Sequence, residues 1–158
     1  MNGKLVGGVI VLSALLAGGA IYYLQEYAFY QPVAFTPGAE IQLTNLTSGL
    51  PEPIPVANLQ GIDATSSPLR FRACFTTTMN QPTLTEGFTV YDKAVPLNAP
   101  SWFDCFDAAS IGAALETGEA IAFLGQAEIA PQIDRVVAVF GDGRAYAWHQ
   151  VNPDAVGD

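Results

Sequence analysis

The longest apolar stretch of the sequence covers residues 5–24 and contains no charged side chain. A helix over these 20 residues rises about 30 Å, which matches the hydrocarbon thickness of a bilayer. Residues 25–30 are polar and aromatic, a composition typical of the membrane–water interface. The pattern therefore predicts a transmembrane helix over 5–24, followed by an interfacial collar and linker over 25–37.

The charges that flank this helix predict its orientation. Lys4 precedes the helix, and the next basic residue after it is Arg70. Because basic residues favour the cytoplasmic side, we expect residues 1–4 in the cytoplasm and the downstream chain outside it. A cleavable secretory signal is the alternative, since residues 18–20 are small and follow an apolar run. Both interpretations export the downstream domain.

Residues 38–152 show the patterns of a β-rich domain. Apolar side chains alternate over residues 69–76, and residues 88–91 and 120–124 also favour strands. Residues 135–140 and 144–150 flank a Gly-Asp-Gly turn, which predicts a β-hairpin because the Asp-Gly step tolerates positive φ.

Other segments predict loops and one helix. Asp107 is a suitable N-cap for a helix that Gly118 would end. The prolines in residues 51–55 favour an extended, polyproline-like segment, and residues 80–87 favour a turn. We expect an α+β fold: one N-terminal transmembrane helix, then a small, loop-rich, mainly antiparallel β domain with one or two helices. Residues 153–158 are expected to form a tail.

Charge restricts the partners of this domain. All 15 acidic residues follow the apolar helix, together with five of the six basic residues, which leaves that part strongly negative. An acidic surface of this kind argues against binding nucleic acid. The expected partners are the lipid bilayer and an integral membrane protein or complex.

Cys74 and Cys105 are the two cysteines of the chain. In an oxidising exported compartment, an isolated pair is most simply a disulfide, with two buried free thiols as the alternative. Their spacing matches neither a CxxC redox motif nor a zinc site.

Few residues suggest chemistry. His149 is the single histidine, which excludes any site that needs two imidazoles. Asp104 and Asp107 are close enough in sequence to act together with it as a polar site, although Asp107 is also explained as a helix cap. Nucleotide loops, nucleophile elbows and HExxH motifs are missing from the sequence. We therefore expect no catalytic, cofactor or metal site.

Small residues gather on one side of the apolar helix. At about 100° per residue, Gly7, Ala14 and Gly18 fall within one sector, and such a seam permits close helix packing in lipid. The alternative is that glycine and alanine are simply common in membrane helices.

In its overall architecture and in its FGDGRAYAW segment, residues 140–148, the chain resembles small uncharacterised bacterial single-pass inner-membrane proteins with an exported α+β domain. The resemblance implies a bacterial inner-membrane location with the domain in the periplasm, and it transfers no catalytic residue. We expect a non-catalytic accessory subunit or assembly factor of a membrane complex. The alternative is a tethered periplasmic enzyme or small-ligand-binding domain.

Overall fold

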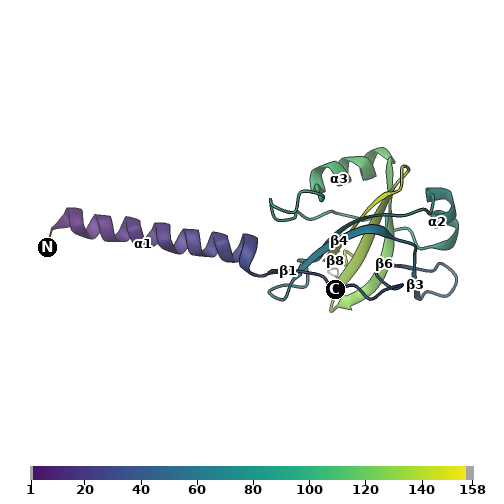
Figure 1. Ribbon diagram of the computed structural model, residues 1–158, viewed down its shortest axis with the longest axis horizontal. Coiled ribbons are helices and arrows are strands. Elements are labelled where there is room, and N and C mark those ends of the chain that lie inside the picture. The colour runs from purple at the N-terminus through teal and green to yellow at the C-terminus, as the bar shows by residue number, and fades with distance from the viewer. Residues whose placement is uncertain (1, 156–158) are drawn as a thin grey trace.

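A long helix projects from one side of a β-sheet domain in the computed structural model, which describes residues 2–155 (Figure 1). Helix α1 (Gly3–Tyr23) continues into a turn of π-helix, η1 (Leu24–Ala28). The span Gly3–Ala28 is long and apolar enough to cross a membrane, and no α1 side chain is buried within the chain. The helix begins two residues before the predicted start, capped by Asn2, and Met1 lies outside the described residues.

The remaining elements belong to the domain. They are β1 (Tyr30–Pro32), β2 (Gln42–Thr44), β3 (Pro51–Pro53), β4 (Ala57–Ala64), β5 (Arg72–Thr76), α2 (Gln81–Gly87), α3 (Ala108–Thr117), β6 (Ala120–Ala130), β7 (Ile133–Phe140) and β8 (Arg144–Val151). Six strands form one sheet in the order β1-β4-β5-β8-β7-β6, and β2 pairs with β3 separately. All paired strands are antiparallel, so the expected α+β class is confirmed.

Both faces of the main sheet are buried. On one face, side chains such as Phe71 and Ala147 pack under β2 and the chain around Ile54. On the other face, Trp148 and its neighbours pack under α3 and the loop that precedes it. This double burial explains why β7 is apolar almost throughout, since a strand covered on both faces has few solvent-facing positions.

The predicted hairpin and the predicted helix cap are both confirmed. Strands β7 and β8 pair around the turn at residues 141–143, where Gly143 has a φ of +90°. The Asp107 carboxylate accepts hydrogen bonds from the backbone N–H groups of Ala109 and Ser110 at the start of α3. Gly118 ends α3 with a φ of +76°, a left-handed conformation that glycine adopts without strain.

Two segments differ from the sequence expectation. Residues 80–87 form a capped helix, α2, rather than a turn, because Asn80 accepts from the Thr83 N–H and Leu84 is fully buried. Residues 88–91 make only isolated bridges instead of a strand. Residues 51–53 are extended, as expected, and pair with β2 as β3.

The strand expected over 69–76 starts only at Arg72. The Arg72 guanidinium donates to the carbonyls of Leu69 and Phe71, so these carbonyls accept from a side chain rather than from a neighbouring strand.

At the other end of the chain, the expected tail is described as far as residue 155. Residues 153–155 form a turn, and Asp154 pairs with Lys93.

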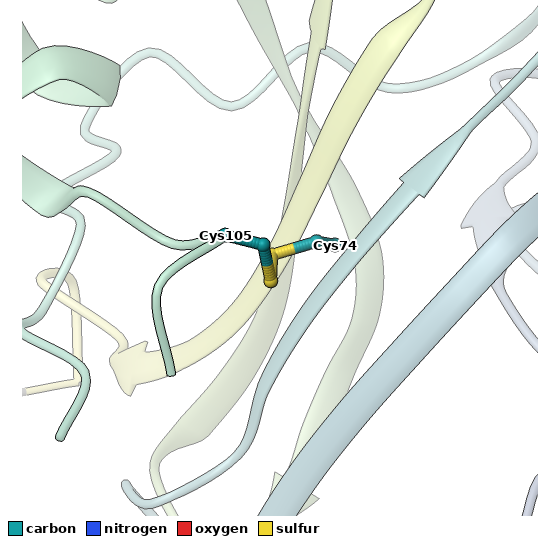
Figure 2. Close-up of a disulfide and its surroundings, with 2 residues drawn as sticks. All are labelled: Cys74 and Cys105. Atoms are coloured by element: carbon teal, nitrogen blue, oxygen red, sulfur yellow. A yellow bond between two sulfur atoms is a disulfide. The ribbon is translucent and has the colours of Figure 1, made fainter. Parts of the chain in front are cut away.

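Cys74 and Cys105 form the predicted disulfide, which joins β5 to the loop before α3 (Figure 2). Their Cα atoms lie 6.2 Å apart, a separation that a disulfide spans without backbone movement. The bond therefore attaches the long loop between α2 and α3 to the centre of the sheet.

Candidate functional site

His149 is the best-defined polar centre of the domain. It lies on β8 directly opposite Arg135 on β7, and its ring stacks on Phe71 with centroids 4.7 Å apart. Arg135 Nε donates to His149 Nε2 at 3.0 Å, and His149 Nδ1 lies 2.7 Å from the Pro68 carbonyl. Since a guanidinium is always the donor, Nε2 accepts and Nδ1 carries the proton that it donates to Pro68. The imidazole is therefore held as one neutral tautomer.

The surroundings of His149 oppose its protonation. Burial, and then the positive charge of Arg135, lower the pKa of His149 to about 4. At neutral pH the side chain is a hydrogen-bonded aromatic ring in the core rather than a charged group.

Arg135 is the unusual member of this cluster. Its guanidinium lies 4.1 Å from the centre of the Phe71 ring, and burial lowers its pKa to about 10. Within residues 2–155, its terminal nitrogens Nη1 and Nη2 have no hydrogen-bond acceptor and no ion-pair partner. Burial also raises the pKa of the nearby Asp63 carboxyl.

Arg135, His149 and Asp63 line an open pocket of about 500 Å³. Its polar walls come from the end of β4, the β4–β5 turn and the β7–β8 hairpin: Asp63, Thr65, Ser67, Arg135 and His149. An unpaired, partly buried guanidinium at such a wall offers two parallel donors to a carboxylate or phosphate.

The polar site expected from Asp104, Asp107 and His149 is divided between two faces of the sheet. His149 packs on Phe71 on one face, whereas Asp107 caps α3, which covers the other face. Asp107 is exposed, and hydrogen bonds from Ser110 lower the pKa of its carboxyl. Asp104 lines a different pocket beside Trp102. In the part of the chain that the structure describes, no three metal-ligating side chains form a group.

A second cluster joins the apolar helix to the domain. The carbonyls of Gln25 and Glu26, within η1, accept from Arg70 and from the Trp102 indole. The Glu26 carboxylate also accepts from the Ser101 N–H. The sequence places Trp102 in an aromatic cluster, but it does not show that this cluster meets the helix.

The sequence of the hairpin is sufficient to predict that His149 and Arg135 lie opposite each other. A hairpin centred on Asp142 pairs residues at equal distances from the turn, which puts residue 135 opposite residue 149. The partners from outside the hairpin, Pro68 and Phe71, have no such signal.

Fold and clusters together define an α+β protein with a disulfide-bonded domain and one N-terminal helix apolar enough to span a membrane. The chain belongs to DUF6446, a family of unknown function, whose match covers residues 41–156. That match covers the domain from β2 onward, including Arg70 and Trp102, and leaves out α1, η1 and β1. No curated protein and no solved structure matches the chain.

Proposed function

We propose that this protein is a membrane-anchored, non-catalytic accessory subunit or assembly factor of a bacterial inner-membrane complex. The observation that carries the proposal is the state of α1. This helix is apolar on all sides and projects from the domain (Figure 1). None of its side chains is buried by the chain itself. Its packing surface is thus available to lipid and to a neighbouring membrane protein.

The small-residue seam is the surface on α1 best suited to a protein neighbour. A Cβ atom added at Gly7 or Gly18 would meet nothing within 4 Å, so no other part of the chain fills this seam. Small residues allow a second helix to approach closely, and the gain in van der Waals contact stabilises helix pairs in lipid.

The polar residues of the domain also favour a structural role. Both nitrogens of His149 have hydrogen-bond partners within the fold, and Asp107 is occupied by the α3 cap. These groups stabilise the domain in the form that would meet a partner.

The test is co-purification from native membranes with the tagged full-length protein. We expect Gly7→Leu with Gly18→Leu to reduce recovery of the partner several-fold without changing insertion. Gly8→Leu with Gly19→Leu is the matched control, because it adds the same bulk on a sector about 100° away, also free of neighbours. Equal effects of the two pairs, or no effect of either, would contradict the proposal.

The proposed topology places residues 1–4 in the cytoplasm and the domain in the periplasm. Lys4 on the N-terminal side and the disulfide in the domain both support it. A phosphatase that is active only after export, fused to the C-terminus, should be active. An inactive phosphatase in a fusion that is expressed at the normal level would show that the orientation is the reverse of the one proposed.

The Arg135 pocket favours a second candidate function, the binding of a small anionic ligand. The wall holds an unpaired guanidinium whose position is set by Phe71 and His149, so an anion would find its donors already oriented. Thermal unfolding of the full-length protein with phosphate, acetate and dicarboxylates tests this candidate. An anion that binds should raise the midpoint with concentration, and Arg135→Gln should abolish that rise. If none of these anions changes the midpoint of thermal unfolding, anion binding at the Arg135 pocket is ruled out.

A further inference from the structure

The junction between helix and domain is short and extensively bonded. A single residue, Phe29, separates η1 from β1, and Tyr30 already pairs with Ala64 in the sheet. Helices leave their last carbonyls without intrahelical partners. Here Arg70 donates to the Gln25 carbonyl at 2.9 Å, and Trp102 donates to the Glu26 carbonyl. The positive charge of Arg70 also suits the negative end of the helix dipole.

The length of the helix places this junction at the membrane surface. The 21 residues of α1 rise about 32 Å, enough to cross the hydrocarbon core. The residues of η1 then fall in the headgroup layer, irrespective of which side of the membrane the domain occupies. Tyrosine and tryptophan side chains concentrate at this depth because they combine an apolar ring with a polar group.

Aromatic rings from the helix and from the domain meet there. Tyr27 stacks on Tyr23 and on Trp102, with centroids 5.9 and 6.4 Å apart. Trp102 also contacts Tyr30 edge to face at 5.9 Å. Trp102 remains 38% exposed and Tyr27 43% exposed, so an apolar surface next to the membrane is left uncovered by the chain.

The loop that carries Trp102 is held at both ends. The disulfide attaches Cys105 to β5, and Arg72, which is buried, donates to the carbonyls of Leu97 and Asn98. The same Arg72 guanidinium binds the Leu69 carbonyl, next to Arg70. One buried side chain therefore ties together the two loops that contact the helix end.

We propose that the interfacial face, formed by Tyr23, Tyr27, Phe29, Arg70 and Trp102, is seated in the lipid headgroup layer and holds the domain upright on the bilayer. The occupant of this face is lipid, because η1 is continuous with α1 and leaves the face at headgroup depth. The rings replace water with the apolar upper part of the acyl chains, and Arg70 lies where it can donate to lipid phosphate. This proposal does not depend on the accessory-subunit function.

Fluorescence quenching by lipid-attached bromine tests the proposal, because the chain has only two tryptophans, with opposite environments. Trp148 is fully buried in the domain core, whereas Trp102 is part of the interfacial face. The full-length protein would be reconstituted in phosphatidylcholine vesicles whose acyl chains carry bromine at different depths. We expect Trp102 emission to be quenched, most strongly by the shallowest bromine. Trp102→Phe should leave only the unquenched emission of Trp148.

Leu50, in the turn between β2 and β3, provides the matched control. It is 64% exposed, so a tryptophan at this position remains on the domain surface. In the Trp102→Phe background, Leu50→Trp should be quenched by aqueous iodide and not by brominated lipid. Lipid quenching of Leu50→Trp would mean that the domain lies on its side, which overturns the proposal.

Two further results would also overturn it: no lipid quenching of the wild type, or equal quenching of wild type and Trp102→Phe. If Trp102→Phe fails to fold, the wild type alone still tests the proposal. The part of the wild-type fluorescence that brominated lipid quenches can be assigned to one tryptophan by its wavelength, because a half-exposed indole emits at longer wavelength than a buried one. Quenching of the short-wavelength emission, which belongs to Trp148, would contradict the proposal.

Discussion

Removal of the Cys74–Cys105 disulfide should destabilise the domain strongly. The bond closes a loop with a sequence separation of 31, and this loop includes α2, residues 88–91 and the Trp102 loop. Without the bond, the unfolded chain gains the conformational freedom of that whole segment, while the folded domain keeps its sheet and its two hydrophobic clusters.

The chain-entropy relation for this separation gives about 12 cal/mol/K, or about 3.7 kcal/mol at 25 °C. Replacing Cys74 by alanine also leaves a small gap, because the residue is 7% exposed and packs beside Trp148 and Ile62. The two contributions add, so a loss of about 4 kcal/mol is expected. For a domain of this size, this loss corresponds to a fall of roughly 10–20 °C in the midpoint of thermal unfolding.

The assay is urea unfolding of the full-length protein in detergent micelles, followed by Trp148 fluorescence and near-ultraviolet circular dichroism. The Cys74→Ala/Cys105→Ala variant would be compared with the wild type before and after reduction. Reduced wild type and the double variant should lose similar free energies of unfolding. A loss below about 1 kcal/mol in both would refute the loop-entropy argument, because it would show that the segment is already constrained in the unfolded chain.

Two further predictions concern the hairpin. The pKa of His149 falls from about 6.5 unfolded to about 4 folded, so the neutral ring contributes stability fully above pH 6.5 and loses it as pH falls toward 4. Unfolding free energy should decline by up to about 3 kcal/mol over that window, and His149→Gln should remove this part of the decline, measured by urea titrations at several pH values. Gly143→Ala should cost about 1–3 kcal/mol, because φ is +90° and an added Cβ would lie 2.8 Å from the Thr77 carbonyl oxygen. Gly141→Ala is its control, with the nearest atom at 3.8 Å, and equal midpoints for the two variants would contradict the argument.

Local sequence signals predicted those parts of the fold whose stabilisation is local. The apolar helix, the Asp107 cap and the hairpin turn each depend on residues within a few positions of one another. Strand β4 lacked such a signal. Its face with Asn58 and Gln60 turns apolar at Ile62, so no single alternation runs through the strand, and a bulge with φ +53° at Asn58 shifts its register against β5.

Helix α2 and residues 88–91 show the opposite problem, because tertiary contacts override the local composition. Leu84 is buried against the sheet and the Gln81 side chain donates to the Glu119 and Val139 carbonyls, and these contacts stabilise a seven-residue helix that is too short to form alone. Thr89 donates to the Thr44 carbonyl and its own carbonyl accepts from Leu124, so residues 88–91 bridge two strands without extending either of them. Single-sequence patterns contain neither the identity nor the distance of these partners.

The His149–Arg135 cluster and the cluster at the junction of helix and domain also differ in how far the sequence predicts them. Hairpin symmetry relates His149 to Arg135, so half of that cluster follows from the turn. The junction cluster has no comparable short-range relation, since Arg70 reaches back 45 residues to Gln25 and Trp102 reaches back 76 residues to Glu26. Their meeting depends on β1 pairing with β4, on the disulfide, and on the carbonyls that Arg72 binds. Three independent long-range constraints thus converge on the end of one helix, and together they fix the orientation of the domain relative to that helix.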